Sequence, residues 1–206
     1  PDPDSNSKLR AVIQNAKSVN MPKDNIDRAI KRAFDKSLGN YKEILFEGYA
    51  PYGVAILVET ATDNNTRTVA NIRSYFNKCN GNLGTSGSVI FTFDHTCNFR
   101  IEKQNIDIEN LEFDLIDFGV EEVFEDEDGI LIYGPFDSFG EIQKALESKE
   151  IQIISSGFDR IPNNLKNVNE EERSEIEKLL EKIENDDGQI YYYNENERMC
   201  VAFAFY

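Results

Sequence analysis

Basic residues on one short stretch are the first candidates for chemistry in this sequence. Residues 20–36 carry Lys23, Arg28, Lys31, Arg32 and Lys36. Lysine and arginine side chains bind phosphate groups and can hold a protein on nucleic acid without reading the base sequence. We therefore interpret this stretch as a candidate anion-binding face.

Helical periodicity gives these cations a common surface. The apolar residues recur at i, i+3, i+4, i+7 and i+8, which predicts an amphipathic helix; they are Ile26, Ala29, Ile30, Ala33 and Phe34. Asp24 lies four residues before Arg28, and Asp27 lies four before Lys31, so ion pairs within the helix are an alternative that would leave only a solvated face. Lys23, Arg32 and Lys36 have no such partner and are the better candidates for phosphate contact.

A second basic region follows, in a predicted helix and the loop after it. Arg67, Arg73 and Lys78 belong to the helix, and the loop at residues 80–87 contains Gly84, Thr85, Ser86 and Gly87. A phosphate-binding P-loop runs from a strand into a helix, whereas this loop leaves a helix and enters a predicted strand. We read it as a structural turn that needs positive φ, with contact to a nucleic-acid backbone as the alternative.

The sequence offers little for catalysis or metal binding. His95 is the only histidine, and the three cysteines are far apart, so neither a catalytic dyad nor a CxxC site is indicated. The acidic residues at 121–128 lack the spacing of a calcium loop. We expect no catalytic residue, no metal and no cofactor.

Charge divides the chain. The net charge is −16, but residues 1–40 hold 8 basic and 5 acidic residues, while residues 95–206 hold 10 and 28. A polyanion is therefore expected to meet the N-terminal side, and basic proteins are possible partners of the acidic C-terminal half. No apolar run is long enough to cross a membrane, and with so few cysteines we expect a soluble cytoplasmic protein.

The order of predicted elements indicates an α+β, multi-domain fold. Two helices occupy residues 1–40, which we expect to pack as a hairpin and to need a third partner, either upstream residues that are missing or the following domain. Strands at 44–49, 54–60 and 89–93 with one helix form a ββαβ segment, and residues 95–165 read βαββαβ, the ferredoxin-like order.

The remaining elements suggest how the chain closes. A helix and a strand at 166–194 cannot form a domain alone, whereas the ββαβ segment lacks a helix and a strand. We expect residues 41–94 and 166–194 to combine into one α/β domain, with 95–165 inserted, and residues 195–206 to be a tail or edge strand.

Several motifs in one order resemble the YebC family of transcriptional regulators, to which mitochondrial translational activators of cytochrome c oxidase also belong. They are PDP at residues 1–3, NMPKDNI with Ala29 and Ile30, EGY with Gly53, Val54 and Ala55, TDN with Arg67–Ala70, Arg73, and NLG with Gly87, Ser88 and Val89. Two departures are the absence of a basic segment before PDP and a turn at residues 50–53 with less glycine than the family usually has.

The resemblance implies an N-terminal helical domain, two α/β domains, nucleic-acid-directed control of gene expression and no enzyme activity. Our leading hypothesis is a transcriptional regulator that binds DNA. The alternative is a ribosome-associated translation factor that contacts RNA. A third hypothesis is a small-molecule-binding module or enzyme that uses the cleft between the α/β domains.

Overall fold

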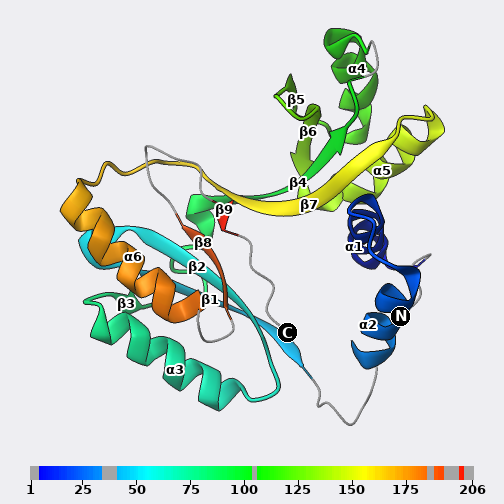
Figure 1. Ribbon diagram of the computed structural model, residues 1–206. Helices are drawn as coiled ribbons and strands as arrows, with labels where there is room; N and C mark the ends of the chain where they lie inside the picture. Colours follow the sequence, from blue (N-terminus) through cyan, green and yellow to red (C-terminus); the bar gives the residue numbers. More distant parts are fainter. Residues whose placement is uncertain (1–4, 34–40, 104–105, 185–187, 193–199, 202–206) are drawn as a thin grey trace. The chain divides into compact units, whose positions relative to one another are not determined.

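Two separate β-sheets and the helices around them make up the structure, a computed structural model that describes residues 5–33, 41–103, 106–184, 188–192 and 200–201 (Figure 1). This confirms the predicted α+β, multi-domain class. The chain divides into two compact units, Pro1–Leu38 with His95–Asp159, and Gly39–Asp94 with Arg160–Tyr206. Each unit is described by itself below.

The first sheet has the order β3-β1-β2-β8-β9. Its strands are β1 (Lys42–Tyr49), β2 (Ala55–Thr62), β3 (Asn82–Leu83), β8 (Gly188–Tyr192) and β9 (Cys200–Val201). Ile56, Leu57 and Val58 of β2 are fully buried although neighbouring strand residues point to opposite faces, so both faces of this strand are covered. The apolar run in β2 is thus a central strand, as the sequence predicts.

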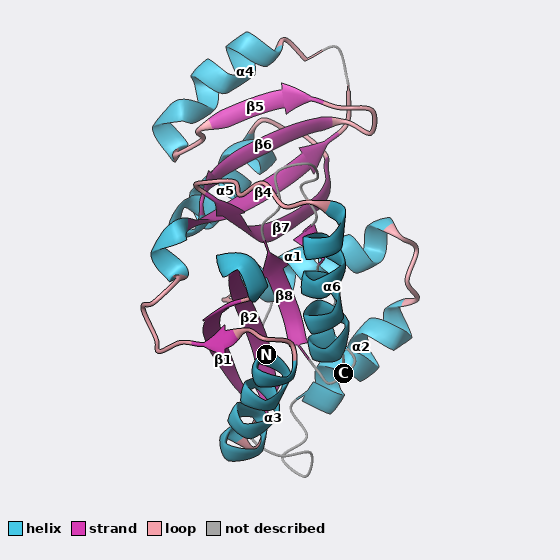
Figure 2. Cartoon of the chain, turned by 90° about the vertical axis from the view of Figure 1, so that its left-hand side faces the viewer, coloured by secondary structure: helices cyan, strands magenta, loops and turns pink. Residues whose placement is uncertain are grey.

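Helices cover one face of this sheet. α3 (Asn65–Lys78) and α6 (Glu170–Glu184) lie side by side there (Figure 2). Their apolar stripes, which include Ile72, Phe76 and Leu179, form one core with Ile56 and Val58. On the other face, Leu57 packs with Val89 and Phe93. Because α6 and β8 come after the second sheet in the sequence, the predicted return of the chain to complete this sheet is confirmed.

One predicted strand is wrong. Residues 89–93 do not add a strand to the first sheet; Ile90–Thr92 form a short 3-10 helix, and the third strand is the two-residue β3 inside the glycine-rich stretch. The backbone N–H groups of Gly87, Val89 and Ile90 donate to the side chain of Glu47. Groups used in this way cannot join a β-ladder.

The second sheet has the order β5-β6-β4-β7 and the ferredoxin-like βαββαβ sequence of elements, as predicted. The elements are β4 (Phe93–Ile101), α4 (Ile108–Leu115), β5 (Glu122–Glu125), β6 (Ile130–Pro135), α5 (Phe139–Ser148) and β7 (Ile153–Pro162). A 3-10 turn, Ile116–Phe118, follows α4. The core contains Phe99, Leu115, Ile132, Ile142 and Leu146.

The N-terminal helices are α1 (Ser7–Ser18) and α2 (Lys23–Ala33). α1 packs against β7, the edge strand of the second sheet, and Ala11 joins that sheet's core. The Asn15 amide donates to the Ser156 carbonyl at 2.6 Å and accepts from the Ser156 N–H at 2.9 Å. The third partner that these helices need is therefore the second sheet, not the first, because this sheet offers an open edge.

The turn at residues 50–53 contains a strained residue. Tyr52 has φ +63°, the left-handed region that favours glycine, although it carries a full side chain. Its hydroxyl donates to Glu175 at 2.7 Å, and Lys166 donates to its carbonyl oxygen. These contacts hold Tyr52 in a conformation that the glycine-richer family turn would adopt without strain.

The domain limits predicted above remain a prediction. Besides the boundary between residues 38 and 39, the two compact units divide inside β4 and inside β7. Of the predicted tail, only Cys200–Val201 is described, and it pairs with β8 as an edge strand.

Candidate nucleic-acid interface

The outer face of α3 is the strongest candidate site. The side chain of Asn64 accepts the Arg67 N–H at 3.1 Å and so caps the start of the helix. Ile72 and Phe76 turn into the core, which leaves Arg73, Asn77 and Lys78 exposed on the opposite side. The helix carries three cations and no carboxylate, in a chain with a net charge of −16.

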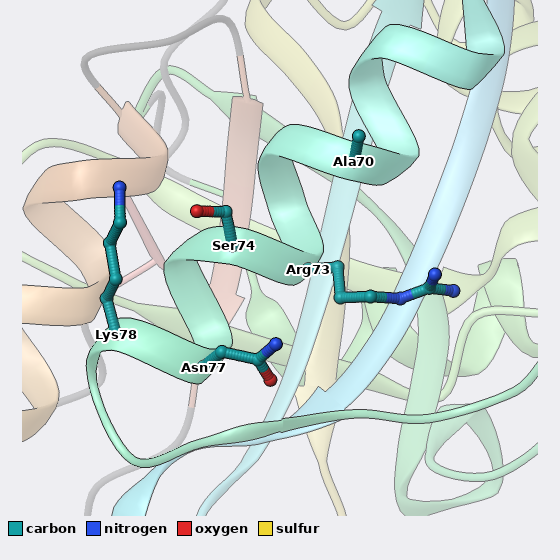
Figure 3. A pocket seen from close by; sticks show the side chains of 5 residues that line it. All are labelled: Ala70, Arg73, Ser74, Asn77 and Lys78. Atoms are coloured by element: carbon teal, nitrogen blue, oxygen red, sulfur yellow. The ribbon is translucent and has the colours of Figure 1, made fainter.

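A shallow hollow lies on this face (Figure 3). Its lining residues are Ala70, Arg73, Ser74, Asn77 and Lys78. Ala70 and Ser74 have short side chains, while Arg73 and Lys78 extend in opposite directions from the helix with Asn77 between them. Two cations, an amide and a hydroxyl suit the oxygens of a phosphate or a sugar.

Ion pairing distinguishes the three cations of α3. Arg67 is bonded to Asp63 at 2.8 Å, across one helical turn at the surface. The side chains of Arg73 and Lys78 form no hydrogen bond or salt bridge with any residue that the structure describes. An incoming anion would therefore meet two uncompensated positive charges in Arg73 and Lys78, whereas Arg67 would have to exchange its partner.

The glycine-rich loop after α3 holds an anion already, and it is the protein's own. The two carboxylate oxygens of Glu47 accept the N–H groups of Gly87 at 2.6 Å, Val89 at 2.7 Å and Ile90 at 2.8 Å. Glu47 is only 4% exposed. Gly87 has φ +85°, as expected for a turn that needs a positive φ. The donors that could cradle a phosphate are occupied.

These contacts decide the charge state of Glu47. Burial by itself raises the pKa of a carboxyl group, but the hydrogen bonds from Gly87, Val89 and Ile90 outweigh it and hold the pKa of Glu47 below its ordinary value. Glu47 is therefore ionised at neutral pH. Its negative charge is stabilised by the backbone N–H groups of the loop.

The other loop residues have separate roles. The Gly84 N–H donates to the Glu47 carbonyl at 2.8 Å, and a side chain at Gly84 would collide with Ser88. Thr85 and Ser86 are exposed. Of the predicted loop contacts, these two hydroxyls are the groups that stay available to a ligand.

The basic face of α2 lies in the other unit. Lys23, Lys31 and Arg32 are exposed and form no salt bridge among the described residues, and Lys36 lies outside them. The predicted ion pairs of Asp24 with Arg28 and of Asp27 with Lys31 are not formed there. Arg28 instead donates to the Asp24 carbonyl at 3.2 Å and to the Asn25 side chain.

The residues considered for catalysis are engaged in packing. The His95 ring stacks on Phe136 with a centroid distance of 3.8 Å. Cys97 is buried and its thiol donates to the Pro135 carbonyl at 3.3 Å. Burial raises the pKa of Cys97 to about 12, so the thiolate needed for nucleophilic attack does not form at neutral pH. Within the described residues, no three of His, Cys, Asp or Glu gather in a way that could hold a metal ion.

Two residues of these sites were missed by sequence reasoning. Glu47 had a signal, since Leu45 and Tyr49 two positions away are apolar and share its side of the strand. Asn77 lies next to Lys78 in sequence, and helical spacing from Arg73 and Ser74 would have placed it on the same face. The prediction considered only positively charged side chains and loop residues, so it omitted both Glu47 and Asn77.

Fold and site together define a multi-domain α+β protein whose unpaired cations lie on helices. Residues 41–195 match the family description "TACO1/YebC second and third domain", and residues 1–36 match "TACO1/YebC protein N-terminal domain". The chain belongs to the TACO1/YebC family. In the described residues, no helix is both long enough and apolar enough to span a membrane.

Relatives in several bacteria carry regulatory names. A "Probable transcriptional regulatory protein" of Flavobacterium johnsoniae is 68% identical over 94% of this chain and 82% of its own length. A protein of the same name from Parabacteroides distasonis is 56% identical over 96% and 82%. The crystal structure of the conserved hypothetical protein Aq1575 from Aquifex aeolicus is similar with a TM-score of 0.74, 32% identity, and coverage of 98% of this chain and 85% of that one.

Proposed function

We propose that this protein is a non-enzymatic regulator of gene expression that binds nucleic acid through the exposed face of α3, with the cations of α2 as a further contact. The regulatory names of its relatives support the general role. DNA is the leading target, in keeping with those names.

One observation carries the proposal. Arg73 and Lys78 have no ion-pair partner among the described residues and lie on a helix with no carboxylate, in a chain that has 38 acidic and 22 basic residues. Such a strongly acidic chain repels polyanions at long range, so a local surface of cations, hydroxyls and amides is where phosphate contact is favourable. Backbone contacts of this type fix position and carry little sequence information.

A neighbouring helix limits what can dock. α6 lies beside α3 and carries seven glutamates against Arg173, Lys178 and Lys182. A wide duplex that covered both helices would meet these carboxylates, whereas a single phosphate chain could follow α3 alone. This favours RNA as the second candidate ligand, in a protein that acts on translation at the ribosome.

The first prediction concerns the α3 face. Replacing Arg73 and Lys78 together with Ala should weaken binding to duplex DNA or to RNA at least about tenfold and lower the slope of log affinity against log salt by roughly two, since each lost phosphate contact removes about one counterion. Fluorescence anisotropy over a salt series measures both quantities. The loss should be about equal for unrelated base sequences.

The matched control removes a cation that already has a partner. Lys103 is bonded to Glu125 at 2.9 Å, so Lys103→Ala should leave nucleic-acid affinity unchanged. Arg32→Ala, tested in parallel, reports on α2. If the Arg73 and Lys78 double variant binds like the original protein, α3 is not the contact surface. Retention on ribosomes without salt-sensitive DNA binding would favour the translation role.

A further inference from the structure

Three exposed apolar side chains lie within six residues, at the end of α4 and in the 3-10 turn Ile116–Phe118 that follows it. Phe113 is 77% exposed, Ile116 59% and Phe118 39%. Phe113 and Ile116 are separated by one helical turn, so they are neighbours on the same side. Single exposed apolar residues are ordinary, but a group of them close together indicates a contact surface. We call these three residues the α4 patch.

The helix beneath the patch is firmly held. Leu111 and Leu115, on the opposite side of α4, are buried in the core of the second sheet. Asp107 accepts the Asn110 N–H and caps the start of the helix. Gly119, at φ +91°, ends the following turn and packs so closely on Ser138 that a side chain would collide. A partner would therefore meet a preformed surface, which lowers the entropy lost on binding.

Carboxylates surround the α4 patch. Glu109 and Asp117 lie four residues before and after Phe113, and Glu112 lies four before Ile116, so each is a neighbour on the helix surface. None of their three carboxylates forms a salt bridge or hydrogen bond with a described residue, whereas Asp114 is bonded to Lys149 at 2.6 Å. Residues 108–118 contain no lysine or arginine.

We propose that the α4 patch binds a basic amphipathic segment of another protein, with apolar residues placed on Phe113 and Ile116 and lysines or arginines placed on the surrounding carboxylates. The stretch at 95–159 holds 17 acidic and 4 basic residues, which would steer such a segment toward it. The same charge excludes nucleic acid from this surface. The protein would thus join a polyanion on α3 to a basic protein on α4.

A defined probe tests this inference directly. The probe is a fluorescent peptide of roughly 15 residues, long enough to form a helix, with leucine on one face and lysine on the other. Its two companions replace leucine with serine, or lysine with glutamate. The leucine and lysine peptide should bind the full chain, the serine peptide at least about tenfold more weakly, and the glutamate peptide not measurably.

Two sets of variants locate the binding surface. Phe113→Ser with Ile116→Ser should weaken binding of the leucine and lysine peptide at least about tenfold, and Phe91→Ser, which alters an equally exposed ring in the other unit, should not. Glu109→Gln with Asp117→Asn should weaken binding and lower its salt dependence, whereas Glu127→Gln should do neither.

The result that would overturn the inference is specific. If the Phe113 and Ile116 variant binds the peptide as the original does, basic peptides are held by general acidity and not by the α4 patch. If sedimentation instead shows self-association that the variant abolishes, the patch binds a second copy of this chain and the proposal is wrong. The variant should keep full nucleic-acid affinity, so its outcome is independent of the α3 test.

Discussion

At Glu47, a carboxylate on a strand is kept charged inside the protein by three backbone N–H groups. The alternation of β1 turns this residue to the same side as Leu45 and Tyr49, where an unpaired charge would be costly. The loop after α3 supplies donors at 2.6 to 2.8 Å. A single side chain thus fixes a loop that lies forty residues further along the chain.

Replacing Glu47 with Gln should destabilise the protein by about 2–3 kcal/mol, because a neutral amide gives weaker hydrogen bonds and turns its own N–H groups toward other donors. Thermal unfolding measures the loss. Glu43→Gln is the matched control, since Glu43 is exposed on the same strand. A Tm for Glu47→Gln equal to that of the control would show that the carboxylate does not hold the loop.

The same residue predicts a pH dependence. The folded-state pKa of Glu47 is below its unfolded value, so the stability that this group contributes is fully present above the unfolded pKa and is lost as pH falls through the folded pKa. Comparing unfolding of the original protein and Glu47→Gln at pH 7 and at successively lower pH should show the difference between them shrinking below about pH 4.3.

Cys97 allows a chemical test of burial. Burial raises the pKa of its thiol to about 12, and Pro135 accepts its hydrogen bond. Iodoacetamide at pH 8 should therefore not modify Cys97 in the native protein. Mass spectrometry of peptides follows the label. Cys79, which is partly exposed, is the internal comparison and should react first. Rapid labelling of Cys97 would mean that the second sheet opens readily.

Among the elements, α1 has the least expected position. It lies along β7. The Asn15 side chain forms hydrogen bonds with both the N–H and the carbonyl of Ser156, as the backbone of a neighbouring strand would do. Gln14 donates to the Ile153 carbonyl at 3.1 Å. The helix therefore covers an edge that would otherwise be free to pair with another chain.

Asn15→Ala should cost about 1–2 kcal/mol of stability, because the N–H and the carbonyl of the buried Ser156 both lose their partner. Hydrogen exchange at the Ser156 amide should become faster while exchange in β6 stays unchanged. Lys17→Ala, an exposed change on the same helix, provides the reference. Equal protection of Ser156 in both variants would show that another contact holds α1 in place.

Elements with a clear period could be predicted from sequence. The stripe of Ile72 and Phe76 gave α3, and the continuous apolar run of Ile56, Leu57 and Val58 gave a central strand, because burial follows the period of the element. The prediction of a strand at 89–93 was wrong because Ile90–Thr92 form a 3-10 turn, and Val89 and Phe93 on either side of it pack against Leu57. Nothing local in that segment reveals that Glu47 takes its N–H groups.

For the whole molecule, topology was easier to predict than sites. An incomplete ββαβ segment and an isolated αβ remainder were each unable to close a domain alone, and β2 does pair with β8. The cations of α3 were found from composition, but whether each is free depends on partners such as Asp63 that only geometry identifies. The α4 patch was missed, since Phe113 and Ile116 read as ordinary members of an apolar helix.

The two strands that pass between the compact units constrain how this protein is made. Residues 39–94 emerge from the ribosome before the strands of the second sheet, but their own sheet waits for Gly188–Tyr192, since Ile56 pairs with Tyr192. The second sheet, whose strands all lie between Phe93 and Pro162, can close earlier. Synthesis should therefore pass through a stage in which the second sheet is folded while the hydrophobic β2 still lacks its neighbour β8, a stage at which chaperones would be expected to bind.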